Sequence, residues 1–313
     1  MDGSSAEPDR DQRSFARRVR DRGRRARRRL SRRFRRWRSE RKRPPWPPEA
    51  VAARTAFERR VRAGAVAGSA PGPSLGLEVF AFSSEHDLPE QVACLRSFLE
   101  HVGEPREFTI VSDGSHSRES VEVLRSVHGC VSVVSWDRLA NPDLPGVVWT
   151  YADHSWQGKK LAMSISLPRD RPVLYCDSDI LFFPAASELR EPGAGSRCLL
   201  DVRARPYLDD RLLHDKRESK PGINSGFYFH SRGLDYGPAL ERIDGLTEWR
   251  TFTEQTVLHL ALRQAGARPF DRARYVMANA DRSKLDDRYV RPDTVLRHYT
   301  TPMRHKFWLA PGR

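Results

Sequence analysis

Short apolar segments alternate with amphipathic helical segments across residues 77–183. Four apolar runs have the length of buried strands: residues 77–84, 107–115, 131–136 and 172–183. Helical periodicity lies between them, over residues 88–102, 117–128 and 156–167. Repeated strand–helix units predict an α/β fold with a mostly parallel sheet flanked by helices, because parallel strands need crossover connections. In such a sheet, a ligand binds beyond the carboxyl ends of the strands.

Basic charge is concentrated at the N-terminus. Residues 1–43 hold 19 of the 55 Lys and Arg residues but only 6 of the 41 Asp and Glu residues, so the rest of the chain is nearly neutral. We therefore predict an Arg-rich arm over residues 1–48, a short helix and linker over residues 49–74, and a single domain over residues 75–313. The last of these segments is long enough to bury one large hydrophobic core.

The partner of the arm is open to three interpretations. A narrow apolar stripe with Phe34 and Trp37 runs through the Arg-rich residues 10–43, which favours an acidic membrane surface. Contact with nucleic-acid phosphates is a weaker alternative, and a solvated tail without a partner is the third. The sequence has no apolar run long enough to span a bilayer, no apolar leader and no metal spacing among its 4 Cys residues. We therefore expect a cytoplasmic protein, peripheral at the inner face of the membrane under the first interpretation.

Two carboxylates interrupt the apolar run over residues 172–183. If the run is one strand, Asp177 and Asp179 point to the same side, and both reach one divalent cation of the kind that prefers oxygen ligands. Two buried carboxylates are costly without a compensating cation. The alternative is a strand end at which both acids are solvated. Ser83 and Asp113 also fall at predicted strand ends, although Asp113 belongs equally well to an Asp-Gly turn.

Four further segments accompany the D-x-D of Asp177 and Asp179: GKKLAMSI (158–165) before it, and GINSGFYFHS (222–231), TEQTVLHLAL (253–262) and RHYTTPMRHKFW (297–308) after it. Together the five segments resemble glycosyltransferases of the GT-A type, and in particular glycosyltransferase family 8, in which similar segments occur in the same order. The D-x-D resembles the metal-binding motif of that group. The resemblance implies one GT-A (Rossmann-like) catalytic domain. Such a domain transfers a sugar from a nucleotide-diphosphate sugar to an acceptor, with retention of the anomeric configuration.

The resemblance also implies roles for single residues. Asp177, Asp179 and His298 would bind Mn²⁺ or Mg²⁺, and the donor would be a UDP-sugar. Contacts to the donor would come from Ser83, Asp113, Lys160, Asn224, Ser225 and Gly226, and the catalytic residues beside the anomeric carbon would be Glu254 and Gln255. For His298, a simple hydrogen-bonded histidine is the alternative to a metal ligand.

The terminal motif departs from the family's pattern. It is longer here, so either Arg304 or Lys306 is expected to contact the donor phosphate. Retention through attack on the front face, without a protein nucleophile, is favoured over Glu254 as a nucleophile, because a second carboxylate at nucleophile spacing is not obvious. The alternative to an enzyme is a non-catalytic protein that binds nucleotide sugars, or a scaffold that binds polyanions through its arm.

Overall fold

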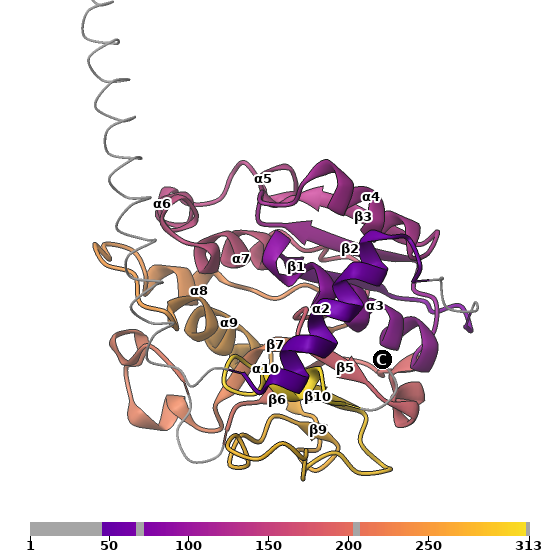
Figure 1. The fold of residues 1–313 in the computed structure, drawn as a ribbon. Coiled ribbons are helices and arrows are strands. Elements are labelled where there is room, and N and C mark those ends of the chain that lie inside the picture. Colours follow the sequence, from indigo (N-terminus) through magenta and orange to yellow (C-terminus); the bar gives the residue numbers. More distant parts are fainter. Residues whose placement is uncertain (1–45, 67–71, 203–206, 311–313) are drawn as a thin grey trace, which may run out of the picture. The chain divides into compact units, whose positions relative to one another are not determined.

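A seven-stranded sheet is the main element of the computed structural model, which describes residues 46–66, 72–202 and 207–310 (Figure 1). The strand order is β3-β2-β1-β4-β7-β6-β8. The strands are β1 (Glu78–Ser83), β2 (Glu107–Ser112), β3 (Val131–Ser135), β4 (Val173–Cys176), β6 (Ser196–Leu200), β7 (Ile223–His230) and β8 (Arg268–Pro269). Our predictions for the arm over residues 10–43 lie outside the described residues.

The first four strands of the sheet are parallel. β1 pairs in parallel with β2 and β4, and β2 pairs in parallel with β3. β7 is antiparallel to both β4 and β6. The prediction of an α/β fold with a mostly parallel sheet is therefore confirmed. The reversal at β7 could not be predicted, because every residue of β7 is buried, and no alternation of buried and exposed residues marks it as antiparallel.

Helices connect the parallel strands and cover the sheet (Figure 1). They are α3 (Leu88–His101), α4 (Arg118–Ser126), α5 (Trp136–Leu139), α6 (Gly146–His154), α7 (Trp156–Ile165), α8 (Gly237–Glu241) and α9 (Thr253–Gln264). Short 3-10 helices lie at η1 (Glu85–Asp87), η2 (Pro184–Arg190), η3 (Asp210–Leu212) and η4 (Lys216–Ser219). The three predicted helices are confirmed as α3, α4 and α7. Ser117 and Ser155 cap α4 and α7 by accepting hydrogen bonds from the backbone of the first turn.

The prediction of one strand over residues 172–183 is wrong. The chain forms β4, turns at Ser178 and Asp179, and continues in a second sheet. That sheet has the order β5-β10-β9 and consists of β5 (Ile180–Phe182), β9 (Tyr275–Val276) and β10 (Leu296–His298). β10 runs antiparallel to β5 and places His298 opposite Ile180. Residues near the end of the chain therefore return to the carboxyl end of β4.

A further helix precedes the first strand. α2 (Pro48–Arg62) packs against α3 and against α10 (Arg304–Phe307). The ring of Phe57 on α2 lies 5.4 Å from the ring of Trp308. Among the described helices, none has both the length and the apolar character that crossing a membrane requires.

Candidate metal centre

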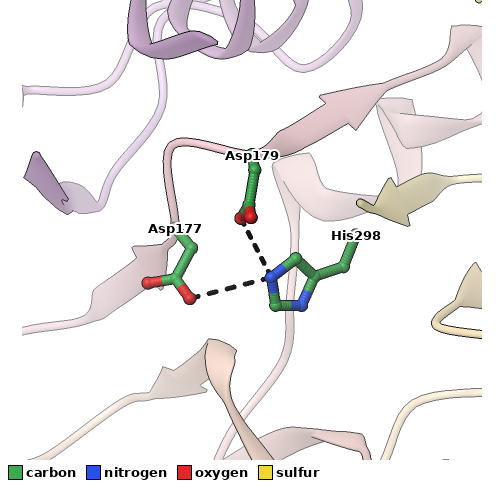
Figure 2. Close-up of side chains that lie close together, drawn as sticks. All are labelled: Asp177, Asp179 and His298. Atoms are coloured by element: carbon green, nitrogen blue, oxygen red, sulfur yellow. Dashed lines mark hydrogen bonds and ion pairs between the residues drawn. The ribbon is translucent and has the colours of Figure 1, made fainter. Parts of the chain in front are cut away.

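Asp177, Asp179 and His298 converge at the carboxyl end of β4 (Figure 2). Their ligand atoms all lie within 4.8 Å of one another. His298 Nε2 is 3.0 Å from Asp179 Oδ1 and 3.7 Å from Asp177 Oδ2. Two carboxylates and an imidazole can hold a divalent cation such as Mn²⁺ or Mg²⁺. The side chain of Asp177 is 25% exposed, whereas those of Asp179 and His298 are buried, so a cation here would be reached from the side of Asp177.

Backbone hydrogen bonds fix the turn that carries the two carboxylates. The backbone N–H of Asp177 donates to Gly226 O (2.7 Å), and that of Tyr299 donates to Asp179 O (2.8 Å). The carboxylates therefore meet because a turn between two sheets brings them together, and not because they share one face of a strand as predicted. The solvated strand end that we considered as an alternative is not found, since Asp179 is buried.

Gly226 on β7 leaves open the space beside the ligand atoms. A Cβ at this position would lie 2.2 Å from His298 Cε1 and 2.8 Å from both Asp177 Oδ2 and Asn224 Oδ1. Such distances are too short for non-bonded atoms, so any larger residue would displace two of the three ligands. The residues present therefore fit a metal ion, because the backbone approaches its ligands as closely as only glycine allows.

Lys160 on α7 is the cation on the Asp177 side. Its Nζ lies 2.7 Å from Asp177 Oδ1, 3.4 Å from Ser225 Oγ and 3.9 Å from Glu254 Oε1. The Tyr175 hydroxyl donates to the same Asp177 oxygen (2.6 Å). Burial alone would lower the pKa of Lys160, but the carboxylates of Asp177 and Glu254 outweigh it and raise that pKa above its ordinary value. Lys160 thus stays charged although it is buried.

Arg304 is the cation on the Asp179 side. Its Nε donates to Asp179 Oδ2 (3.0 Å), and another guanidinium nitrogen donates to Asp87 Oδ1 (2.6 Å). Burial would lower the pKa of Arg304, but the two carboxylates raise it. Burial would raise the pKa of Asp179, yet Arg304 and His298 hold it well below its usual range. Asp179 is therefore a carboxylate at any physiological pH.

Lys306 makes its contacts elsewhere. Its ammonium is fully buried, and it donates to Asp281 Oδ2 (2.6 Å) and to the backbone oxygen of Asp286 (2.6 Å). The sequence analysis left open whether Arg304 or Lys306 of the terminal motif contacts the donor phosphate. In the structure, Arg304 is the one that contacts a residue of the metal group, by which we mean Asp177, Asp179 and His298.

Polar side chains of β7 and α9 contact one another next to Lys160. Ser225 Oγ donates to Glu254 Oε2 (3.2 Å), and Asn224 Nδ2 donates to Gln255 Oε1 (3.1 Å). The side-chain amide of Gln255 in turn donates to Tyr207 O (2.7 Å). Gln255 is thus bound at both ends of its amide, whereas Glu254 Oε1 has no hydrogen-bond partner among the described residues. Glu254 is the member of this layer that can accept a new partner.

The carboxyl group of Glu254 titrates near neutral pH. Its side chain is buried, and burial raises its pKa from 4.5 to about 7, although Lys160 acts in the opposite direction. At pH 7 the group is therefore a mixture of acid and carboxylate. In its acid form it can donate a hydrogen bond as well as accept one.

The raised pKa of Glu254 predicts a dependence of stability on pH. Burial lowers the pKa values of His230 and His259, so these two residues make the protein more stable as the pH rises. Glu254 acts against them: the unfolded chain deprotonates at lower pH than the folded one, so the contribution of Glu254 to the free energy of unfolding should fall by about 2 kcal/mol as the pH rises from 5 to 8. Glu254→Gln keeps the shape of the neutral acid and should remove this slope, leaving the variant more stable than the native protein at pH 8. Urea unfolding at several pH values measures this, with Glu241→Gln at the exposed end of α8 as control. Equal slopes in the native protein and Glu254→Gln would contradict the prediction.

Ser83 and Asp113 lie side by side at the ends of β1 and β2. The backbone N–H of Asp113 donates to Ser83 O (3.0 Å). Ser83 Oγ is buried and has no hydrogen-bond partner in the described part of the chain. The carboxylate of Asp113 accepts from the backbone N–H of Ser115 (2.9 Å), as expected for a turn residue. A contact between Asp113 and a nucleobase stays a prediction.

Tyr175 and Asp87 are two contacts of the site that the sequence analysis missed. Tyr175 lies on β4, two residues before Asp177, and a hydroxyl inside an apolar run was a signal for a polar partner. Asp87 had no such signal, because its partner Arg304 follows it by 217 residues.

Comparison with known proteins gives similarity of structure only. No protein-family model matches the sequence, and no curated protein sequence matches it significantly. The galactosyltransferase LgtC, solved with donor and acceptor sugar analogues, is similar at 13% identity and a TM-score of 0.43, over 72% of this chain and 87% of that one. Mouse xyloside xylosyltransferase 1 is similar at 15% identity and a TM-score of 0.44, over 74% of this chain and 99% of that one.

The glycosyltransferase GlyE of Streptococcus pneumoniae is also similar, at 12% identity and a TM-score of 0.41, over 64% of this chain and 46% of that one. These solved structures are glycosyltransferases, the group that the sequence resembles. At such identities the likeness concerns the fold alone. Membership of glycosyltransferase family 8 stays a prediction.

Proposed function

We propose that the protein is a metal-dependent glycosyltransferase that uses a nucleotide-diphosphate sugar. The observation that supports this best is the group of Asp177, Asp179 and His298, with Lys160 against one carboxylate and Arg304 against the other. A divalent ion at this group and the two side-chain cations together suit a diphosphate, which has several charged oxygens close together. The group also lies at the carboxyl end of β4, where sheets of this kind bind ligands.

Charge stabilisation is the chemistry that these residues would supply. A bound Mn²⁺ or Mg²⁺ would neutralise part of the charge on the diphosphate. Lys160 and Arg304 would add positive charge where the leaving group gains negative charge, which lowers the barrier to breaking the sugar–phosphate bond. Arg304 offers a planar fork and Lys160 a point charge, so we assign orientation of the phosphate to Arg304.

The sugar would bind on the side of Glu254. Its Oε1 is buried without a hydrogen-bond partner in the described residues, and its raised pKa allows it to bind a sugar hydroxyl as donor or acceptor. Asn224 and Ser225 would complete this pocket. Gln255 would act mainly by holding Asn224, because its own amide is already hydrogen-bonded at both ends. The nucleobase would lie near Ser83 and Asp113.

Retention would follow from attack on the front face of the sugar. We assign Glu254, the buried carboxyl group beside Lys160, to binding of the sugar and not to nucleophilic attack, and one of its oxygens already accepts a hydrogen bond from Ser225. The acceptor hydroxyl would therefore lose its proton to the leaving diphosphate. A UDP-sugar as donor, a cytoplasmic location and attachment of residues 10–43 to an acidic membrane remain parts of this proposal that rest on the sequence.

Thermal unfolding of the full-length protein tests the proposal. We expect one of UDP-glucose, GDP-mannose, ADP-glucose and TDP-glucose to raise the melting temperature by about 5 °C when present at a hundred times its dissociation constant with Mn²⁺. Excess EDTA should remove the shift, as should Asp179→Asn. The matched control is Asp244→Asn, at an exposed position after α8. No shift with any nucleotide sugar would overturn the proposal and would favour a scaffold that acts through its basic arm.

A further inference from the structure

Arg54 on α2 is joined to a buried carboxylate of α3. Its guanidinium donates to both carboxylate oxygens of Glu90 (2.8 and 3.0 Å) and to the backbone oxygen of His86 (2.6 Å). The side chain of Glu90 is only 1% exposed. A buried carboxylate is costly unless a cation pairs with it, so Glu90 depends on α2, an element outside the domain that we predicted from the sequence.

Glu90 also joins α2 to the end of the chain. The indole N–H of Trp308 donates to Glu90 Oε1 (3.0 Å), and the ring of Phe57 on α2 packs against the Trp308 ring. One carboxylate thus accepts hydrogen bonds from two segments that are far apart in the sequence. Trp308 directly follows α10, which begins at Arg304.

Arg304 lies between Glu90 and the metal group. Asp87, one helical turn before Glu90, and Asp179 both accept hydrogen bonds from Arg304. Burial would lower the pKa of Arg304, but Asp179, Asp87 and Glu90 all raise it, so Arg304 is within reach of the charge of Glu90. If Arg54 did not neutralise Glu90, that carboxylate would compete with Asp179 for Arg304.

We propose that Arg54 is a positioning residue for the donor site: by neutralising Glu90 and fixing Trp308, it keeps Arg304 on Asp179. This inference rests on the proposed function for the part of Arg304 in binding the diphosphate. It makes α2 a necessary part of the enzyme, although in the described part of the chain no hydrogen bond or ion pair joins α2 to Asp177, Asp179 or His298. The protein cut at the start of our predicted domain, residue 75, would lack this support.

Hydrogen exchange of the full-length protein tests the positioning without any ligand. In Arg54→Ala, we expect the amides of residues 299–310 to exchange about tenfold faster, including Tyr299, whose amide is bonded to Asp179. The central strands β1 and β2 should exchange as in the native protein. Arg59→Ala, at an exposed position of the same helix, is the control and should change nothing over 299–310. Unchanged exchange over 299–310 in Arg54→Ala, or equally faster exchange throughout the chain, would overturn the inference.

Titration with UDP in the presence of MnCl₂ tests the consequence for binding. We expect Arg54→Ala to bind UDP about tenfold more weakly, because Arg304 is drawn toward Glu90. Adding Glu90→Gln removes the competing charge and keeps an acceptor for Trp308, so the double variant should regain most of the native affinity. Because Glu90→Gln also removes the cost of an unpaired buried carboxylate, urea unfolding of each variant is measured alongside, and the loss of affinity in Arg54→Ala should exceed what its unfolded fraction accounts for. Failure of the rescue would overturn the inference.

The two proposals can fail separately. If neither the native protein nor any variant binds UDP or another nucleoside diphosphate with Mn²⁺, the proposed function fails, and hydrogen exchange over residues 299–310 then decides the role of Arg54. If the native protein binds UDP and Arg54→Ala binds it equally well, the role of Arg54 fails and the proposed function stands.

Discussion

Asp179→Asn should reduce sugar transfer by about a thousandfold at saturating Mn²⁺ and donor, the loss typical of removing one preorganised charge contact from an active site. Asp179 is close to both His298 Nε2 and Arg304 Nε. The amide has the same shape as the carboxylate but no charge, so it binds a divalent ion weakly and releases Arg304. Because its pKa lies well below the usual range, Asp179 is charged throughout any practical assay.

Initial rates of donor hydrolysis and of transfer, measured with circular dichroism as a check on folding, give the size of this loss. Asp244→Asn makes the same chemical change at an exposed position and should keep full activity. Of these two variants, only Asp179→Asn should bind Mn²⁺ more weakly than the native protein, as measured by electron paramagnetic resonance. Should Asp179→Asn keep its rate within about threefold of the native value, the metal group would not be the catalytic centre.

Patterns of adjacent residues predicted the early strands of the fold. Apolar runs with helical periodicity between them led to β1, β2 and β3, because these signals depend on residues that are neighbours in the chain. The break between β4 and β5 was missed for the same reason: Ser178 and Asp179 turn the chain inside an otherwise apolar run. Only the pairing of β5 with β10, more than a hundred residues later, fixes where that turn occurs.

In the candidate site, too, patterns of adjacent residues were readable from the sequence, whereas contacts between distant segments were not. Asp177 and Asp179 stood out because carboxylates are rare inside apolar runs. His298 and Arg304 could be singled out only through the resemblance of the terminal segment, since no periodicity links them to a turn that lies 119 and 125 residues earlier. The choice between Arg304 and Lys306 needed the structure, because spacing does not say which of two basic residues on a short helix contacts Asp179 and which contacts Asp281.

α2 is the clearest case of information that the sequence did not contain. Its helical periodicity was visible, and we predicted a helix there. Its contacts with Glu90 and Trp308 join three segments that no local pattern relates. A domain boundary drawn from composition therefore separates α2 from residues against which it packs.

Gly226→Ala should cost activity and stability together, although it adds a single methyl group. The new Cβ would lie 2.2 Å from His298 Cε1 and 2.8 Å from Asp177 Oδ2, so the ligands must move by about 1 Å or more to relieve the contact. A displacement of that size in a catalytic group costs about a hundredfold in rate. Overpacking of a buried site should also lower the free energy of unfolding by about 1 to 3 kcal/mol.

Gly129→Ala is the matched control, since a Cβ there meets no atom within 4 Å. It should keep both the native rate and the native affinity for Mn²⁺. In Gly226→Ala we expect weaker Mn²⁺ binding even where the protein is fully folded, because His298 and Asp177 are pushed apart by the same methyl group. Native Mn²⁺ affinity in a folded Gly226→Ala would mean that the ion binds elsewhere. The group of Asp177, Asp179 and His298 would then no longer support the proposed function. Weaker Mn²⁺ binding in a folded Gly226→Ala would instead support a site that is shaped by the backbone of β7 as well as by the side chains of His298 and Asp177.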